Sequence, residues 1–349
     1  MSENNIAVVI LNWNTRDMLK RYLPEVIRHS RFSGASIVVA DNGSNDGSCE
    51  LIEKDFPEVQ LIKLDKNYGF AGGYNRAIKR IKAKYSVLLN SDVIPSPNWL
   101  SPLFENLETS NNIAAAVPKI KSLKAPTMFE YAGAAGGFID KWGYTFCRGR
   151  IFDSLEQDEG QYSNSGDIFW GSGAALMVRT ELFNQTGGLN EHFFAHMEEI
   201  DWCWRMKNLG MQIQYVPDSE VFHLGGGTLS AMSSHKTYLN FRNNLFLLYR
   251  NLPDKGLHQT LFFRLLLDGV AALKFFISGD LNNLKAIFRA HRDYFRRKPF
   301  LREERTLLRK DIRKENHKEI YQGSIIWDYF IRGKKHFGEL NFPDIQNKL

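Results

Sequence analysis

Short apolar runs and helical segments alternate through the first part of this 349-residue chain. The apolar runs, each of the length of a buried strand, lie at 6–11, 37–40, 59–64 and 85–89. The segments between them, 15–29, 48–56 and 70–83, have helical spacing of their apolar residues. This order predicts a parallel sheet with helices on both of its faces, and it constrains the fold more than any other feature of the sequence.

Polar side chains follow several of these predicted strands at the point where each strand ends. Asn12 closes the first, Asp41 the second, and Asn90, Ser91 and Asp92 follow the fourth. Because the carboxyl ends of parallel strands share one edge of a sheet, and open α/β sheets bind ligands there, these residues are expected to face one crevice.

Two loops after these strands allow both a structural and a binding interpretation. The loop that begins at Asp41 has the composition of a turn, yet a carboxylate at a strand tip also accepts the imide N–H of a pyrimidine base. The glycines between Asn67 and Asn75 either pack a helix closely on the sheet or let backbone N–H groups approach a phosphate at the helix end. Their spacing matches neither a dinucleotide fingerprint nor a Walker loop.

Acidic residues and one histidine supply the candidate chemistry. Asp92 at a strand end suits a divalent cation that bridges phosphates, and otherwise serves as a turn residue. Glu198 and Glu199 are adjacent at the start of a predicted helix, 197–209, where they either cap the helix or raise each other's pKa toward that of a general base. His223 ends a short apolar run, as a metal ligand or as a structural residue.

The rest of the chain is less regular up to about residue 230 and helical beyond it. Glycine and aromatic residues at 131–150 predict a hairpin or an acceptor loop, and 212–216 and 220–223 are expected to be separate closing strands. No strand pattern is seen after residue 233. The prediction is therefore a domain at 1–230 and a helical, basic region at 231–349.

Composition and charge restrict where such a chain works. Its three cysteines are far apart, which excludes a disulfide scaffold, and its first apolar run is too short for a signal peptide. No apolar stretch approaches the ~20 residues of a membrane span. A cytoplasmic protein is expected, attached peripherally to the inner face of the cell membrane.

The attachment rests on the C-terminal region. The net charge of the chain is +6, and residues 285–318 alone hold 13 Lys and Arg against 5 Asp and Glu. Aromatic residues lie among these cations, which is typical of helices that contact an anionic membrane, and the alternative is a helix packed on the first domain with a solvated basic face. Within 257–276 the charged residues Arg264, Asp268 and Lys274 occupy an arc of about 120°, so a wide apolar face remains for either a membrane or the rest of the protein. No nucleic-acid recognition motif is present, and no nucleic acid is expected as a partner.

Taken together and in this order, the motifs resemble those of the family 2 glycosyltransferases, with a GT-A fold, and especially their rhamnosyltransferase-like branch. The matching segments span about residues 5–250 and are VVILNWN at 8–14, VVADNGSNDGS at 38–48, NYGFAGGYNRAI at 67–78, LLNSDV at 88–93, GSGAALMVR at 171–179, GGLNEHFFAHMEEIDWCWR at 187–205 and PDSEVFHLGGGT at 217–228.

The resemblance implies a metal-dependent, inverting transfer of a sugar from a nucleotide-diphosphosugar to a hydroxyl of a glycan or lipid-linked acceptor, in surface polysaccharide synthesis. Deoxythymidine-diphospho-rhamnose comes first among the donors it implies, with UDP-hexoses and GDP-sugars open. It implies Mg or Mn held by Asp92 and His223, and Glu199 as the general base, with Glu198 as its rival. The implied donor-binding residues are Asn12, Asn14, Asp41, Asn42, Gly69, Gly72, Asn75, Asn90 and Ser91, and the implied acceptor residues are Trp170, Gly171, Ser172 and Gly173.

Two positions depart from the family pattern. Asn90 begins a motif that usually carries a carboxylate at both ends, and Glu199 stands where Asp is usual. These departures keep a second hypothesis open, a sugar-binding protein without catalysis. A third, a sugar nucleotidyltransferase, lacks the basic Gly-rich loop expected after the first strand, where this chain reads Asn12-Trp13-Asn14-Thr15.

Overall fold

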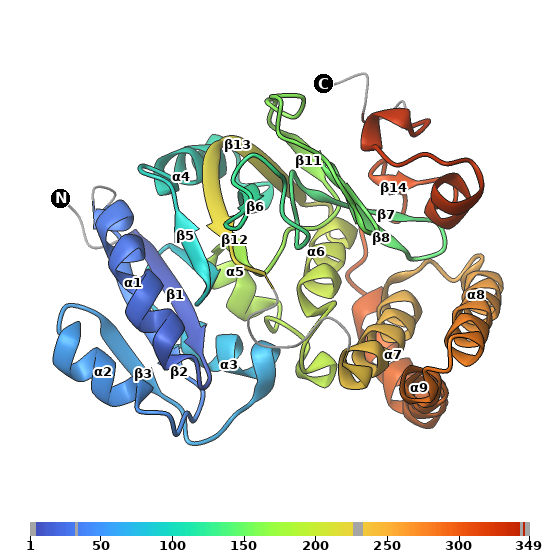
Figure 1. Ribbon diagram of the computed structural model, residues 1–349, viewed down its shortest axis with the longest axis horizontal. Coiled ribbons are helices and arrows are strands. Elements are labelled where there is room, and N and C mark those ends of the chain that lie inside the picture. Colours follow the sequence, from blue (N-terminus) through green and yellow to red (C-terminus); the bar gives the residue numbers. More distant parts are fainter. Residues whose placement is uncertain (1–4, 32–33, 226–232, 343–344, 346–349) are drawn as a thin grey trace.

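The computed structural model describes residues 5–31, 34–225, 233–342 and 345 (Figure 1). Within these residues, nine strands form a large mixed sheet and five form a smaller one. Helices α7, α8 and α9 gather at the end of the molecule opposite the N-terminus (Figure 1). The predicted α/β class with a helical C-terminal region is confirmed.

The strands of the large sheet are β1 (Ile6–Asn12), β2 (Ser36–Asp41), β3 (Gln60–Lys63), β4 (Tyr85–Asn90), β5 (Val93–Pro95), β6 (Ile113–Ser122), β11 (Gly166–Ile168), β12 (Ala175–Arg179) and β13 (Gln212–His223). Those of the small sheet are β7 (Gly137–Asp140), β8 (Thr145–Cys147), β9 (Arg150–Ile151), β10 (Ser154–Leu155) and β14 (Ile320–Tyr321). The α-helices are α1 (Arg16–Ser30), α2 (Ser48–Asp55), α3 (Gly69–Ile78), α4 (Leu100–Thr109), α5 (Thr180–Gln185), α6 (Glu198–Asn208), α7 (Ser234–Asn251), α8 (Leu257–Ile277) and α9 (Leu281–Arg309). Short turns of other helix types are η2 (Glu191–Phe193), η3 (Trp327–Ile331) and η4 (Phe337–Glu339).

The large sheet is parallel only in its N-terminal half. Strands β3, β2, β1 and β4 are parallel neighbours in the predicted manner. Beyond them β12 runs antiparallel between β4 and β6, and β5 and β11 are antiparallel to β13. The predicted parallel sheet is thus confirmed for the strands from which it was inferred, and the antiparallel strands belong to the middle of the chain, where the sequence is less regular.

Both faces of the sheet are covered, because alternate residues of β1 point to opposite sides. Ile6, Val8 and Ile10 pack in one core with side chains of α1, α2 and α4. Ala7 and Val9 face the other core, which includes side chains of α3, α5 and α6. The prediction of helices on both faces is confirmed.

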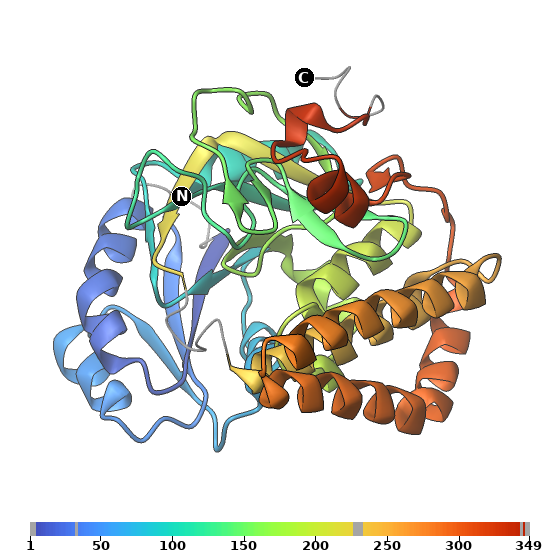
Figure 2. The ribbon, with the colours of Figure 1, turned by 45° about the vertical axis from the view of Figure 1, so that its right-hand side comes forward.

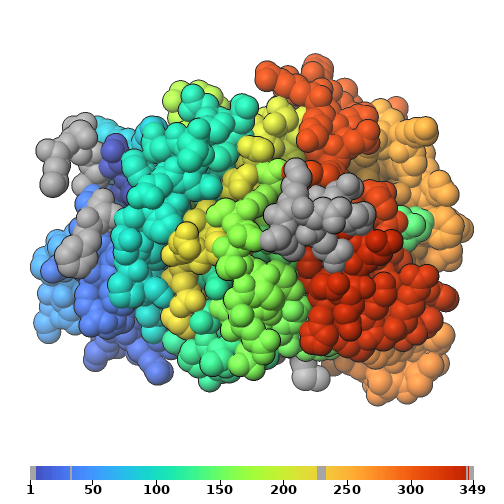
Figure 3. Space-filling model, turned by 90° about the horizontal axis from the view of Figure 1, so that it is seen from above, coloured from blue at the N-terminus to red at the C-terminus, as the bar shows by residue number. Residues whose placement is uncertain are grey.

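The C-terminal part returns to the body of the protein. β14 pairs in parallel with β7, Ile320 opposite Ile139. In the view from above, C-terminal residues in red lie against green residues of the middle of the chain (Figure 3). The prediction of no strand after residue 233 is therefore wrong. The sequence could not indicate this strand, because two residues are too few to show an alternation of apolar and polar side chains. The predicted boundary near residue 230 falls in 226–232, outside the described residues.

The two predicted closing strands form one strand. β13 runs from Gln212 to His223, and its register against β6 shifts between Val216 and Glu220. The irregularity includes Pro217, which has no N–H to donate and is tolerated in a sheet at such breaks. One continuous strand thus carries His223 to the edge where β4 ends.

A buried charge cluster joins α6 to α7. Asp201 accepts from Arg205 Nε at 2.9 Å, from Arg250 Nε at 3.0 Å and from Asn251 Nδ2 at 2.8 Å. Burial alone raises the pKa of Asp201, but the two guanidinium groups outweigh it and hold that pKa below its usual range. Asp201 and Arg205 are four residues apart on α6, the spacing at which a carboxylate and a guanidinium pair on a helix.

Asp201→Ala is expected to lower the free energy of unfolding by about 3–5 kcal/mol, because it leaves two buried guanidinium groups without their shared anion. Urea unfolding at pH 7 measures the loss, with Asp218→Ala, an exposed aspartate on β13, as the control. Since the folded-state pKa of Asp201 is lowered, its contribution is lost as the pH falls, so the deficit should shrink below about pH 4. A deficit under about 1 kcal/mol at pH 7 would contradict this account.

Candidate active site

The ends of three neighbouring strands bring the first candidate residues together. In the sheet register Asn12 of β1 lies opposite Asp41 of β2, and Leu11 lies opposite Asn90 of β4. Thr15 Oγ1, just past β1, donates to Ser91 Oγ at 3.2 Å, which links the first loop to the end of β4. These residues therefore meet at the carboxyl ends of the three strands, and a ligand-binding crevice there stays a prediction.

The Asp41 carboxylate is bonded to protein through both oxygens. Asn12 Nδ2 donates to its Oδ1 at 2.7 Å and the Ser44 backbone N–H donates to its Oδ2 at 2.9 Å. Asn12 is fully buried and Asp41 is 2 % exposed. Asn14, in the left-handed region at φ 53°, continues this network by accepting from the Asn45 backbone N–H. These residues fix the shape of the loops, and their direct contact with a donor stays a prediction.

The N-terminus of α3 is closed by protein acceptors. The N–H groups of Phe70 and Ala71 donate to the Phe194 carbonyl, and those of Tyr68 and Gly69 donate to the side chains of Asn42 and Asn67. A Cβ added at Gly69, at φ +72°, would lie 2.6 Å from the Phe194 ring. Of the two interpretations of these glycines, the structure supports close packing, because the amides that would bind a phosphate already have acceptors.

Asn75 and Gly72 face the loop before α6. Asn75 Nδ2 donates to the Leu189 carbonyl at 2.7 Å, and the Leu189 N–H donates to Asn75 Oδ1 at 2.9 Å. A Cβ at Gly72 would lie 3.2 Å from a carboxylate oxygen of Glu191. Both residues therefore connect α3 to this loop, and a donor-binding role for them stays a prediction.

Asp92 and His223 meet across the pairing of β5 with β13. His223 lies opposite Val93, and its Nε2 lies 3.1 Å from Asp92 Oδ1. The other ring nitrogen, Nδ1, lies 3.1 Å from Glu130 Oε2. Burial lowers the pKa of His223, but hydrogen bonds to Asp92 and Glu130 and their charges outweigh burial and raise it to about 10. The imidazole is thus held between two carboxylates.

Glu130 is a site residue that the sequence did not indicate. It lies in no motif and far from His223 along the chain, but its backbone N–H donates to the Ile120 carbonyl of β6, the strand that pairs with β13. A Cβ at Gly225, which has φ +69°, would lie 2.7 Å from Glu130 Oε1, so the glycine leaves room for this carboxylate. A carboxylate that holds the distant nitrogen of a histidine is the usual support of a metal-binding imidazole.

Glu198 and Glu199 open α6, and each has an oxygen with no hydrogen-bond partner among the described residues. These atoms, Oε2 of both side chains, are buried. Burial raises the pKa of Glu199 to about 7, against opposing backbone hydrogen bonds. Burial and the charge of Glu199 raise the pKa of Glu198 well above its usual range. A buried carboxylate without a partner is costly, which makes this pair a candidate for contact with a substrate.

The backbone that leads into α6 is strained and held from α7. Phe194, His196 and Met197 all have positive φ, at 67°, 68° and 73°. Asn243 Nδ2 donates to the carbonyls of Phe193, Ala195 and His196 at 3.0, 2.8 and 2.7 Å. Such strain in residues other than glycine persists where surrounding contacts impose it, and it concentrates at functional sites. Asn243 lies in the helical region, where sequence reasoning assigned no site residue.

The predicted acceptor residues differ in how near they lie to the acid pair. A Cβ added at Gly173 would be 4.0 Å from the Glu199 Cβ and 2.9 Å from the Phe70 ring, so this position is next to the pair. Trp170 is 5 % exposed and donates to the Phe138 carbonyl at 2.9 Å. Gly171 faces Val117, and Ser172 Oγ accepts from the Ala174 N–H at 3.2 Å. Gly173 is therefore the predicted acceptor residue that lies beside the side chain of Glu199.

Backbone contacts link the acid pair to the end of β4. The Asn90 N–H donates to the Ala174 carbonyl at 3.0 Å, and Ala174 follows Gly173, which backs onto Glu199. A family profile described as Glycosyl transferase family 2 matches residues 7–173, which contain the strands of this crevice up to Gly173. Over residues 7–173, just under half of its length, the chain matches glycosyltransferase family 2. It is a transferase that moves a sugar from a nucleotide-sugar donor.

Relatives agree with this assignment. The transferase is 26 % identical over 236 residues to N-acetylglucosaminyl-diphospho-decaprenol L-rhamnosyltransferase of Mycobacterium tuberculosis, covering 62 % of this chain and 75 % of that protein. The structure is similar to GalNAc-T7 with UDP, GalNAc and Mn²⁺, at a TM-score of 0.55 and 19 % identity, covering 71 % of this chain and 48 % of that one. It is also similar to the mannosyltransferase PcManGT of Pyrobaculum calidifontis with GDP-Man and Mn²⁺, at 0.51 and 12 %, covering 84 % and 88 %. These likenesses confirm the GT-A fold.

The residues present fit a divalent cation shared with a donor diphosphate. Among the described residues, no group of three His, Cys, Asp or Glu side chains is arranged to hold a metal alone. A cation beside Asp92 Oδ1 would replace the proton that His223 Nε2 shares with this carboxylate, while Glu130 stays on Nδ1. Cations such as Mg²⁺ bind through one or two protein groups plus substrate phosphates, so a pair of ligands suits this use.

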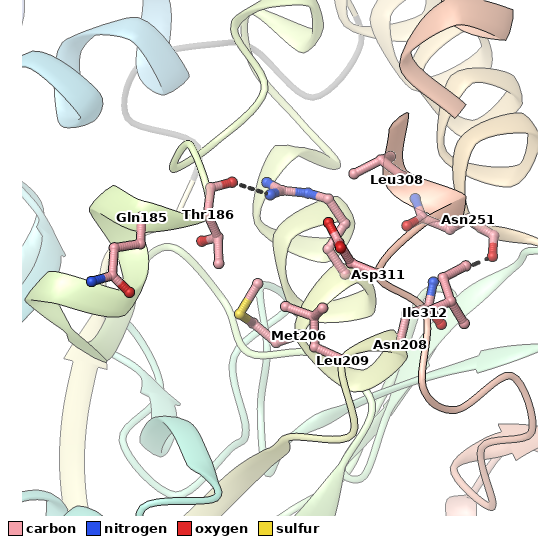
Figure 4. A pocket seen from close by; sticks show the side chains of 10 residues that line it. Gln185, Thr186, Met206, Asn208, Leu209, Asn251, Leu308, Asp311 and Ile312 are labelled. Atoms are coloured by element: carbon pink, nitrogen blue, oxygen red, sulfur yellow. Dashed lines mark hydrogen bonds between the residues drawn. The ribbon is translucent and has the colours of Figure 1, made fainter. Parts of the chain in front are cut away.

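A pocket of about 230 Å³ lies away from these residues, where α6, α7 and α9 meet (Figure 4). It is lined by Thr186, Asn208, Asn251 and Leu308, among others. Its polar groups already have partners within the lining: Arg205 donates to the Thr186 carbonyl, and Asn208 Nδ2 donates to the Asn251 carbonyl. The pocket therefore belongs to the helix junction around Asp201 and not to the crevice of the transferase.

Proposed function

We propose that this transferase moves a deoxyhexose, with L-rhamnose from deoxythymidine-diphospho-rhamnose as the first candidate, to a hydroxyl of a lipid-linked glycan in polysaccharide synthesis, with inversion at the anomeric carbon. The observation that carries the proposal is Glu199, whose pKa of about 7 and unpartnered buried oxygen suit a general base at the crevice. The mycobacterial relative, named as a rhamnosyltransferase acting on a decaprenol-linked sugar, supports the choice of donor and acceptor.

In the proposed reaction, Glu199 takes the proton of the acceptor hydroxyl while the oxygen of that hydroxyl bonds to the anomeric carbon. The bond from that carbon to the diphosphate breaks, and its electron pair leaves with the diphosphate. Glu198 stays protonated beside it, since burial and the Glu199 charge raise its pKa, so a single ionised carboxylate faces the reaction. One base without a second, nucleophilic carboxylate favours inversion, as in inverting glycoside hydrolysis.

Asp92 and His223 would hold Mg or Mn in this proposal, and the cation would offset charge on the leaving diphosphate. Glu130 would keep the imidazole ring oriented. Asn243 and Asn75 would act as positioning residues, because they hold the loop that leads to Glu199.

The test is release of nucleoside diphosphate from a panel of donors: deoxythymidine-diphospho-rhamnose, UDP-glucose, UDP-N-acetylglucosamine and GDP-mannose. A polyprenyl-diphosphate-linked N-acetylglucosamine serves as acceptor, with Mn or Mg present. We expect the rhamnose donor to react fastest, and NMR of the product to show the opposite anomeric configuration to the donor. Faster transfer from another donor would overturn the rhamnosyl assignment, and a product with retained configuration would overturn the mechanism. Absence of any donor-dependent product would favour the non-catalytic hypothesis.

A further inference from the structure

Helix α8 has its charged residues inside and its apolar residues outside. Arg264 and Asp268 are 5 % and 0 % exposed. On the opposite face, Leu266, Val270 and Ile277 are 52 %, 65 % and 77 % exposed. Phe262, Leu273 and Phe276 extend the same surface and are also exposed. A helix that bordered only water would place these two sets the other way round.

The buried charges fix this orientation. Arg264 Nε donates to Asp268 Oδ1 at 2.8 Å, and His291 Nε2 of α9 lies 3.0 Å from Asp268 Oδ2. The Arg264 guanidinium lies over the Tyr144 ring, 4.0 Å from its centre. Because Asp268 ties α8 to α9 and Arg264 contacts the loop before β8, rotation of α8 to bury its apolar face would break this network.

Helix α9, which runs beside α8 (Figure 2), adds an apolar stripe lined by cations. Leu281, Phe288 and Phe295 follow one another at intervals of seven residues and are 50 %, 65 % and 53 % exposed. Seven residues correspond to nearly two turns, so these side chains share one side of the helix. The exposed residues next to this stripe in the helical projection are cationic, Arg292 and Arg296 among them.

We infer that the exposed faces of α8 and α9 form a docking surface for an anionic lipid bilayer, on which the transferase lies without crossing it. No helix in the described part of the chain has the length and apolarity to span a membrane. Apolar side chains with cations beside them match the acyl boundary and the anionic headgroups of such a bilayer. The surface would bring the crevice to an acceptor that is anchored in lipid.

Charge decides against a second copy of the chain as the occupant. A symmetric dimer through this surface would place the same patch on both sides, and residues 285–318 carry 13 Lys and Arg against 5 Asp and Glu. Two such cationic segments repel each other, whereas an anionic bilayer attracts the segment. The inference does not depend on which sugar the transferase moves.

Co-sedimentation with vesicles tests the proposal. The full chain should bind vesicles of phosphatidylglycerol and phosphatidylcholine, bind pure phosphatidylcholine much less, and detach as salt is raised. Val270→Glu with Ile277→Glu should lower the partition coefficient by about tenfold or more, since both side chains would enter the bilayer. Leu155→Glu, at an exposed leucine of β10 outside this surface, is the matched control and should bind as the wild type does. Arg292→Glu with Arg296→Glu should remove the preference for anionic vesicles and leave helix content unchanged.

Three outcomes would overturn the proposal. The first is no binding of the wild type to phosphatidylglycerol vesicles. The second is equal loss in the Leu155→Glu control, which would show a nonspecific effect. The third is a wild-type dimer in light scattering that Val270→Glu with Ile277→Glu makes monomeric, without vesicle binding, which would make the surface a subunit interface. Circular dichroism of each variant shows that it is folded, and donor turnover is measured separately, so failure here is distinct from failure of the transferase assignment.

Discussion

Glu199→Gln is expected to lower the rate of sugar transfer by about 10²–10⁴-fold, the usual contribution of a positioned general base. The substitution keeps the size and burial of the side chain but removes its ability to accept a proton. Affinity for the nucleotide donor should be unchanged, because the base acts on the acceptor hydroxyl. Transfer is measured as kcat, and donor binding as the Kd of the nucleotide sugar in the absence of acceptor.

The rate of transfer by the wild type should increase with pH. The base must be ionised to act, so kcat/KM of the wild type should rise with pH and level off above about 7, where the Glu199 pKa lies. The residual rate of Glu199→Gln should lack that rise. A profile that is flat from pH 5 to 9 in the wild type would contradict the assignment.

Glu198→Gln is the matched control, with the neighbouring carboxyl changed in the same way. Because the pKa of Glu198 is raised well above its usual range, this side chain is already neutral near pH 7, and its amide should keep the transfer rate within about tenfold. The reverse ranking, a large loss for Glu198→Gln and a small one for Glu199→Gln, would move the base to Glu198.

Burial of Glu199 should also lower the free energy of unfolding at high pH. A carboxyl whose folded-state pKa is raised is protonated more readily in the folded than in the unfolded protein, so stability falls as pH rises from about 4.5 through about 7. For Glu199 this shift corresponds to about 3 kcal/mol above pH 7. Glu199→Gln is therefore expected to unfold at higher urea than the wild type at pH 8 and at the same urea at pH 4, whereas a group that only supports the fold would lose stability.

The sequence predicted the parts of this molecule that local patterns encode. Each strand from β1 to β4 is a short apolar run followed by a polar residue, so the crevice and the meeting of Asn12, Asp41 and Asn90 were predictable. The acid pair could be found because its carboxylates are adjacent in one motif, and His223 because it ends a strand beside Asp92.

What the sequence did not show depends on contacts between distant segments. Glu130 and Asn243 reach the site through tertiary packing, and nothing around them in the sequence marks a function. The glycine-rich start of α3 allowed a phosphate site, but the Phe194 carbonyl, far along the chain, takes its amides. For α8 the apolar arc was visible, but its direction was decided by the bond from Asp268 to His291 of another helix.

The support of His223 by Glu130 leads to the second large effect, on cation binding. Asp92→Ala should weaken binding of Mn²⁺ in the presence of the donor's nucleoside diphosphate by more than about 100-fold, since it removes the carboxylate of a two-residue ligand pair. Glu130→Gln should weaken it by about 10–100-fold, the usual cost of losing the partner that orients a metal-binding imidazole. Glu220→Gln is the control, because Glu220 lies on the same strand, three residues before His223, and pairs with Lys121 at 3.2 Å. Titration calorimetry with Mn²⁺ and the nucleotide measures these constants without turnover.

If Glu130 has only a structural role, Glu130→Gln will lower the melting temperature and leave the Mn²⁺ Kd equal to that of Glu220→Gln. If Asp92→Ala binds Mn²⁺ as the wild type does, the cation is not held at Asp92 and His223, whatever the transfer rate of the variant.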